Sequence, residues 1–407
     1  MSLLLKVLPM SLSARLQPHH RVFAAFAIYA FGLGQIFPRL ADIKFAMGIE
    51  EGALGLALMG IAVGTITALT LSTVLVTKIG HRIAMLTLIP AMALFFAMAS
   101  FASEPLAFFF LLIPAGLCIG AVEIIINVEA DRVEAGMDRR IMSRAHAFWS
   151  LGFFGAAAYS AIMVKFGITA QTQLIASIPI CILLTWMFLK AFQPATIRVT
   201  DSNEKSPIVA KPTFAIMILV GVTLSSMLLE GASIDWTAIY MDSVFEAIPE
   251  MGAIGVATAA LSQGMVRYFG DRFVDRFAPT PVARGMQTIM ALGIITVFFA
   301  PDPLFALVGF ALIGAGNAMM FPLAMSAAAQ RTDRPAAINV AALAQFSFVT
   351  FLLAPPLLGF IAEHFGLRWT FGIGLPLVVL SFALSGALGS KPAKAFSVSA
   401  ANNDAIT

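Results

Sequence analysis

Long apolar runs recur along the whole chain, and they limit its fold more than any other feature. A helix of about 20 residues spans the ~30 Å hydrocarbon layer of a bilayer and satisfies its own backbone hydrogen bonds. Of the 407 residues, 59% are hydrophobic and 12% are charged, which excludes an ordinary soluble domain. The alternating pattern of a membrane barrel is absent, so the runs predict an all-α membrane protein.

The apolar runs divide into twelve predicted transmembrane helices. Their predicted residues are 22–43, 52–76, 83–101, 105–130, 143–165, 170–190, 213–240, 249–269, 282–300, 303–329, 336–362 and 368–389. An even number of spans places both termini on the same side of the membrane.

The basic residues predict which side that is. Of the 25 Lys and Arg residues, 21 fall in the terminal segments and in alternate loops. Because short cytoplasmic loops collect Lys and Arg, we expect both termini to be cytoplasmic, in a bacterial inner membrane. The net charge of +3 then follows from topology and indicates no nucleic-acid partner.

The polar stretch QPATIRVTDSNEKSPIVAKP is the longest break between apolar runs, and it predicts a linker between two halves of six helices. IGAVE at 119–123 and IGAGN at 313–317 occupy corresponding places in the two halves, as expected of an internal repeat. The repeat makes Asn317 the counterpart of Glu123. We expect four parts: a helical bundle over 1–192, a cytoplasmic linker over 193–212, a second bundle over 213–390 and a cytoplasmic tail over 391–407.

Several classes of chemistry lack their motifs in this chain. It has no phosphate-binding glycine loop, no paired catalytic carboxylates and no zinc-spaced His and Cys set. Cys118 and Cys181 lie inside predicted spans and are expected to be buried thiols. We therefore expect no enzyme activity, no cofactor and no metal. We also expect no cleaved signal peptide at the N-terminus, where Met1 and Met10 are alternative starts.

Two turns that combine Gly with basic residues follow spans two and eight, TKIGHR at 77–82 and GDRFVDRFAPTPVAR at 270–284. With twelve spans and a central linker, they resemble the major facilitator superfamily along essentially the whole chain. The resemblance implies two six-helix bundles and a cytoplasmic gate whose charges pair in one conformation and separate in the other. The alternative is that these charges only set topology. The gate residues would be Lys78, Gly80, Arg82, Asp271, Arg272, Asp275 and Arg276.

Three stretches further resemble the sugar–proton symporters of the fucose permease type: VEIIINVEAD at 122–131, EAIPEMGAIG at 246–255 and DRFAPTPVA at 275–283. The fourth helix of that family carries a glutamate followed four residues later by an asparagine, and Glu123 and Asn127 match this pattern. The resemblance implies that Glu123 takes part in proton transfer. The chain departs from that family at its first-span aspartate, because the stretch GLGQIFPRL offers only Gln35 and Arg39.

The spacing around Glu123 agrees with this role. Steps of 4, 3 and 4 residues put two glycines, Glu123 and Asn127 on one face of the fourth span. A charged carboxylate near mid-membrane is costly, so this face must meet the bundle interior or a wet cavity, where Glu123 can exchange a proton. The alternative is a permanent ion pair with Arg132 or Arg144, although Arg132 lies ~13 Å further along the helix.

Span seven carries a polar stripe at helical spacing that includes Thr223, Ser226 and Glu230. Small polar residues at such spacing more often hold membrane helices together than bind ligand, and we expect this of Thr223 and Ser226. Glu230 is the second predicted proton-coupling residue, lining a vestibule. Its alternative is an interfacial carboxylate that simply reaches water.

Polar and aromatic residues in other spans are candidates for solute binding. Trp149 suits stacking against the apolar face of a sugar or a heteroaromatic solute. His146 matches a position that the resemblance places near the sugar, and its alternative is a histidine in contact with water at the cytoplasmic end. The candidate solute-binding residues are Gln35, Asn127, His146, Trp149, Asn317 and Gln345.

These features predict a monomeric transporter driven by an ion gradient, whose partners are the bilayer, protons and a small solute. The leading hypothesis is a proton-coupled symporter that imports a hydrophilic solute such as a sugar. The second is a proton-driven exporter of drugs or metabolites, which would need a larger and mostly apolar cavity. The third, a sensor or scaffold, would need a docking module, and the short tails offer none.

Overall fold

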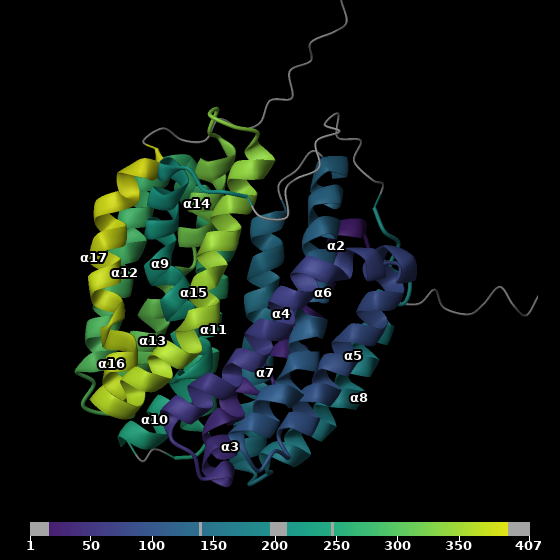
Figure 1. Cartoon of the computed structure of the whole chain (residues 1–407), viewed down its shortest axis with the longest axis vertical. Coiled ribbons are helices and arrows are strands. Elements are labelled where there is room, and N and C mark those ends of the chain that lie inside the picture. Colours follow the sequence, from purple (N-terminus) through teal and green to yellow (C-terminus); the bar gives the residue numbers. More distant parts are fainter. Residues whose placement is uncertain (1–15, 138–140, 196–209, 246–247, 390–407) are drawn as a thin grey trace, which may run out of the picture.

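The computed structural model describes residues 16–137, 141–195, 210–245 and 248–389, without the side chains of 70–78, 271 and 337. All regular secondary structure in these residues is helical, and the two halves of the chain lie side by side (Figure 1). Most of the predicted linker and the whole tail lie outside the described residues, so the predicted bounds of these parts stay predictions.

The first half contains the helices that correspond to predicted spans one to six. They are α2 (Pro18–Leu33), the short 3-10 helix η2 (Phe37–Arg39), α3 (Leu40–Met47), α4 (Glu51–Ile79), α5 (His81–Ala99), α6 (Pro105–Met137), α7 (Met142–Lys165) and α8 (Ala170–Leu189).

The second half corresponds to predicted spans seven to twelve. Its helices are α9 (Phe214–Asp235), α10 (Thr237–Phe245), α11 (Met251–Phe277), α12 (Pro279–Phe298), α13 (Pro303–Asn317), α14 (Met320–Ala329), α15 (Ala336–Phe365), α16 (Leu367–Gly372), α17 (Gly374–Leu384) and the 3-10 helix η3 (Ser385–Leu388).

Eleven segments of the described chain are long and apolar enough to cross a membrane. The remaining predicted span, α11, is 27 residues long but is not one of the eleven. Gln263 and Arg267 lie within it and lower its hydropathy. Because both side chains are buried against other helices, α11 keeps polar groups away from lipid.

The first helix of each half is broken, which the sequence analysis did not predict. In the first half, α2 ends at Leu33, and Pro38 lies in η2, where its missing N–H and fixed φ do not allow the α-helix to run on unchanged. In the second half, α9 ends at Asp235 and α10 begins at Thr237. Broken helices near the interface of two repeats are typical places for binding sites in transporters.

Glycines bring α4 and α6 into close contact. A Cβ atom added to Gly116 would collide with the carbonyl oxygen of Ile61, and one added to Gly64 would collide with that of Ile113. The Thr65 hydroxyl donates a hydrogen bond to the Gly116 carbonyl over 3.2 Å. Small residues at the contact let two membrane helices approach closely, so the part of α6 around Gly116 packs directly on α4.

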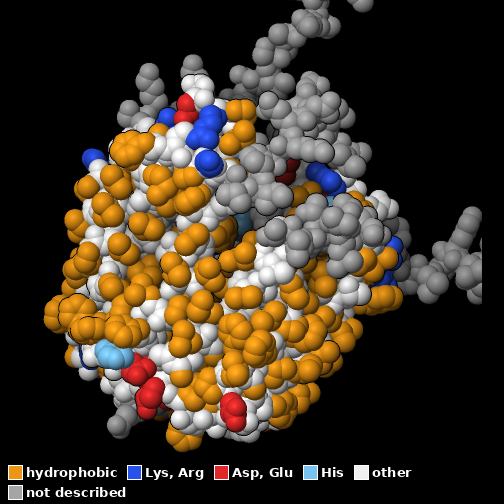
Figure 2. Space-filling view, in the orientation of Figure 1, with side chains coloured by type: hydrophobic (Ala, Val, Ile, Leu, Met, Phe, Trp, Pro, Cys, Tyr) orange, Lys and Arg blue, Asp and Glu red, His pale blue; other side chains and the backbone are white. Residues whose placement is uncertain are grey.

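The surface of the molecule divides into an apolar belt and two polar ends (Figure 2). We call the end where α8 finishes and α9 starts the linker face, and the end with α3 and α10 the opposite face. Lys and Arg side chains gather at the linker face in this view, whereas the acidic side chains appear mainly at the opposite face. Large exposed apolar side chains such as Phe110, Trp186 and Leu304 form part of the belt, as expected for contact with lipid.

Candidate functional site

The Glu123 carboxylate lies on α6 between hydrogen-bond donors from two helices. The Asn127 Nδ2 atom, one turn further along α6, donates to Glu123 Oε1 over 3.0 Å and to the Glu123 carbonyl oxygen over 2.9 Å. The hydroxyl of Tyr29, a buried residue of α2, forms a side-chain hydrogen bond with the same carboxylate. The predicted partnership of Glu123 and Asn127 is therefore present, and Tyr29 is an addition to it.

Arg132, one of the two basic residues that offered an alternative partner for Glu123, is engaged elsewhere. The Arg132 guanidinium lies 3.3 Å from Glu129 Oε1, on the same helix. Glu129 is buried, pairs also with His81, and accepts a hydrogen bond from the Ala195 backbone N–H over 2.9 Å. Glu129 thus ties α5 and the end of the first half to α6, while Glu123 faces the interior.

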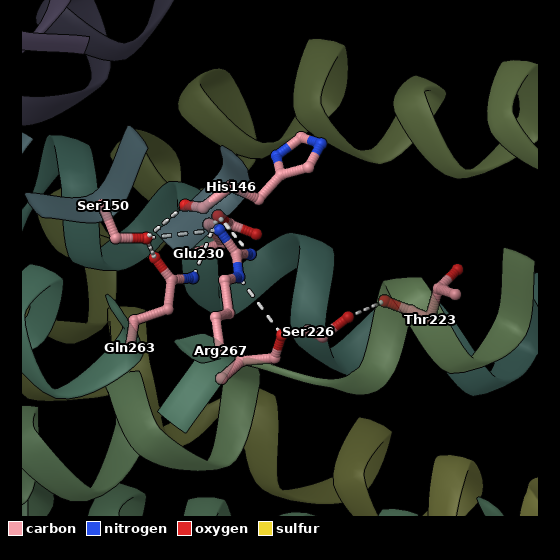
Figure 3. Close-up of polar contacts among 8 residues, drawn as sticks. His146, Ser150, Thr223, Ser226, Glu230, Gln263 and Arg267 are labelled. Atoms are coloured by element: carbon pink, nitrogen blue, oxygen red, sulfur yellow. Dashed lines mark hydrogen bonds and ion pairs between the residues drawn. The ribbon is translucent and has the colours of Figure 1, made fainter. Parts of the chain in front are cut away.

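Glu230 belongs to a polar network that crosses between the halves (Figure 3). Its Oε1 atom accepts hydrogen bonds from Gln263 Nε2 over 3.0 Å and from Arg267 over 3.3 Å, both on α11. The Ser150 hydroxyl on α7 donates to Gln263 Oε1 over 3.2 Å and accepts from Arg267 over 3.4 Å. Arg267 and Ser150 therefore connect the second half to the first.

The sequence analysis missed Arg267, Gln263 and Ser150. It counted Arg267 among the basic residues that set topology, because the residue lies near the end of a predicted span. One signal was available: Gln263 and Arg267 are four residues apart, so they share a face of α11. An arginine in line with a glutamine inside an apolar helix indicates a buried carboxylate partner.

A small pocket of about 30 Å³ lies at the junction of the halves. The Trp149 ring stacks on Phe153, with centroids 5.4 Å apart, and both line the pocket together with Glu230 and Gln263. Asn317, on the opposite wall, is buried, and its Oδ1 atom has no hydrogen-bond partner among the described residues. The structure thus brings three predicted residues together in one pocket: Trp149, Glu230 and Asn317.

Gln35 and His146 lie in the bundle interior beside other first-half helices. Gln35 is fully buried at the break after α2, and its Nε2 atom donates to the Phe31 carbonyl over 3.1 Å. The His146 ring packs edge-on against Phe26, with centroids 5.1 Å apart, and its backbone oxygen accepts from Ser150. His146 borders the polar network through Ser150, and neither residue lines the pocket.

Gln345, a candidate of the second half, lies towards the linker face. Its Oε1 atom accepts a hydrogen bond from the Ala210 backbone N–H over 3.0 Å, so it contacts the chain that enters α9. Asn339, six residues before it, donates to Asp333 over 3.0 Å. Thr223 exchanges a hydrogen bond with Ser347 of α15 over 2.8 Å, which is the helix-joining role expected of it.

The predicted gate residues lie at the linker face. The side chains of Lys78 and Asp271 lie outside the described residues. Gly80 has φ +81° where α5 begins, a conformation that favours glycine. Arg82 and Asp275 are exposed, and the guanidinium groups of Arg272 and Arg276 lie over Phe269 and Phe277. The paired form of the gate is not seen among the described side chains, so the latch stays a prediction.

The halves make a direct contact at the opposite face. Glu363 Oε2, near the end of α15, accepts a hydrogen bond from the Gly52 backbone N–H at the start of α4 over 3.0 Å. Gly55 and Gly359 allow the two helices to touch there, since a Cβ on either would meet the backbone of the other helix. The opposite face is therefore held closed between α4 and α15.

Two helical halves with a polar site at their interface have the architecture of a secondary transporter. The family model of the Major Facilitator Superfamily matches residues 218–402. The chain is 27% identical over 362 residues to an MFS-type transporter of Yersinia pestis, covering 89% of this chain and 93% of that protein. It is 28% identical over 360 residues to the transporter y4wD of Sinorhizobium fredii, covering 88% and 94%.

Solved structures share this fold. A variant of the nucleoside transporter NupG superposes with a TM-score of 0.70 at 13% identity, over 92% of this chain and 100% of that one. A D-xylose–proton symporter superposes with a TM-score of 0.67 at 16% identity, over 92% and 98%. The family match, the full-length relatives and the shared fold make this chain similar to transporters of the Major Facilitator Superfamily.

Proposed function

We propose that this transporter is a proton-coupled symporter that imports a small hydrophilic solute, such as a sugar, across the bacterial inner membrane. The observation that carries the proposal is the setting of Glu123. It lies inside the bundle, and the groups that act on it in the described part of the chain are Tyr29, Asn127 and the Glu230 carboxylate, none of which is a cation. A carboxyl group in such a place can hold a proton without a competing ion pair.

Alternating access supplies the coupling. While the site is dry, the protonated acid is favoured, and when the cavity opens to water the proton can leave. With the linker face on the cytoplasmic side, the contact between Gly52 and Glu363 closes the site to the outside. This conformer would release solute and proton inwards, in keeping with import.

The pocket favours a polar solute over an apolar drug. Trp149 offers an aromatic face, while Glu230, Asn317 and Ser233 offer hydrogen-bonding groups around it. Rings that carry several hydroxyl groups use both kinds of surface. A nucleoside transporter and a D-xylose–proton symporter share the fold, which adds support for a solute of this kind. The exporter hypothesis requires a larger, mostly apolar pocket. A pocket of that kind lies between α7 and α11, so export is the second candidate function.

The test is uptake by the purified full chain in proteoliposomes under an imposed pH gradient, acid outside. The probes are labelled monosaccharides and nucleosides, with an apolar cationic dye as the probe for export. We expect at least one hydrophilic probe to accumulate, and a proton ionophore to abolish the accumulation. Accumulation that survives the ionophore, or gradient-driven movement of the dye alone, would contradict the proposal.

The gate gives a second prediction. Replacing Arg276 by Ala should shift the balance between the two open forms by about 1.4- to fivefold, since exposed ion pairs contribute roughly 0.2–1 kcal/mol. The measurement is the rate of labelling of single cysteines introduced at the linker face and at the opposite face. Lys165→Ala, which removes an exposed basic residue at the end of α7, is the control. An unchanged labelling ratio in Arg276→Ala would show that these charges only set topology.

A further inference from the structure

Two carboxylates act on each other in the interior of this transporter, and among the described residues a cation pairs with only one of them. Glu230 on α9 lies close enough to Glu123 on α6 to act on it electrostatically. The Arg267 guanidinium is 3.3 Å from Glu230 Oε1. Glu123 has only hydroxyl and amide donors, from Tyr29 and Asn127. The two acids therefore differ in the charge of their partners, although the sequence offers both as proton carriers.

Arg267 is held in a fixed position by its other contacts. The residue is 8% exposed, its Nε atom donates to the Ala318 carbonyl over 3.2 Å, and another of its nitrogens donates to Ser150 over 3.4 Å. Gln263 adds a second donor to the same Glu230 oxygen. Glu230 therefore receives a guanidinium and an amide on one oxygen, and the contact with the guanidinium is a charge-assisted hydrogen bond.

We propose that Arg267 is a positioning residue that keeps Glu230 as the permanent anion of the site and thereby assigns the exchangeable proton to Glu123. The inference rests on the proposed proton coupling and names the residue that decides which acid carries the proton. With Glu230 neutralised by Arg267, Glu123 cycles between charged and neutral forms beside a pair of no net charge. Without Arg267, two carboxylates compete in one place, and the site holds a proton more tightly.

The other titratable groups around the two acids belong to three elements. Tyr29 comes from α2, His146 from α7 beside Arg267, and Asp235 lies five residues beyond Glu230 on α9 itself. Among the described residues, the cation that contacts one of the two acids is Arg267, on Glu230. Variants at Arg267 and Glu230 leave Tyr29, His146 and Asp235 in place, so they test this pair alone.

The experiment follows protons directly and needs no solute. Infrared difference spectra of the purified full chain in lipid nanodiscs are recorded across pH, and the carbonyl band of a protonated carboxylic acid is measured. The part of the band that disappears in Glu123→Gln belongs to Glu123. We expect this part to persist in Glu230→Gln, because the proton is not on Glu230. Loss of the titrating band in Glu230→Gln and not in Glu123→Gln would overturn the assignment.

Substitutions of Arg267 then test its role. In Arg267→Gln we expect the acid band to persist to a pH about one unit higher or more than in the parent, as for two carboxylates that share a site. Arg267→Lys keeps a cation and should stay near the parent. The double variant Arg267→Gln with Glu230→Gln should lose the upward shift. Like Arg267→Gln alone, it lacks the contacts of Arg267 to Ala318 and Ser150, so loss of those contacts cannot explain the difference.

These outcomes separate a positioning role from a structural one. If Arg267→Gln titrates like the parent, or if the double variant stays shifted like Arg267→Gln, Arg267 does not act through Glu230 and the inference is wrong. If Arg267→Gln yields no folded protein, the other two variants decide. A shift of about one pH unit or more in Arg267→Lys would overturn the inference. Loss of the Glu123 band in Glu230→Gln would overturn it as well. Failure of proton-driven uptake in the parent would instead refute the proposed function.

Discussion

Glu123→Gln is expected to abolish accumulation driven by a pH gradient while preserving exchange of solute across the membrane. Glutamine matches the protonated acid in shape and charge, and it can still receive the hydrogen bonds of Asn127 and Tyr29. The variant therefore passes through both open forms but carries no proton. One pH unit corresponds to about 1.4 kcal/mol, so one-to-one symport in the parent reaches at most about tenfold accumulation, and the variant about onefold.

The measurement compares two assays on the same proteoliposomes, with the solute that the uptake screen selects. Counterflow exchange at equal pH reports binding and alternating access, and uptake under a gradient of one pH unit reports coupling. Glu104→Gln is the matched control, because it neutralises an exposed carboxylate just before α6. If Glu123→Gln accumulates solute as well as the parent does, the proton is carried elsewhere and Glu230 becomes the next candidate.

The second large effect concerns folding. Gly116→Ala places a methyl group against the Ile61 carbonyl at the contact of α6 with α4, where the backbone has to move to admit it. Overpacking of this kind costs about 1–3 kcal/mol. Gly136, on the same helix, has open space around it, so Gly136→Ala should be neutral or slightly stabilising through its higher helix propensity.

The expected changes in stability therefore differ: Gly116→Ala should destabilise the fold, whereas Gly136→Ala should not. Thermal unfolding in detergent, followed by the loss of monodisperse protein, measures both. We expect a lower midpoint for Gly116→Ala and an unchanged or higher midpoint for Gly136→Ala. Equal midpoints for the two variants would mean that α4 and α6 can separate without cost, against the packing described above.

The fold class and the approximate helix positions followed from the sequence because membrane insertion is decided segment by segment. Each run long and apolar enough to span the bilayer becomes a helix whatever its neighbours are. Eleven such segments are present in the described chain, and the class of fold is confirmed. The pairing of Glu123 with Asn127 was predictable for a similar reason, since residues four apart on a helix are neighbours before any tertiary contact forms.

The site depended on tertiary structure. Arg267 lies 37 positions from Glu230 and 117 from Ser150, so no local pattern links them, and the sequence analysis counted Arg267 as a topology-setting charge. Gln345, predicted for the solute, contacts the backbone of Ala210. Hydropathy and helical spacing act within one helix and determine where helices lie and which face turns inwards. Which polar groups meet across that interior depends on how α6, α7, α9 and α11 pack, and only the folded bundle decides it.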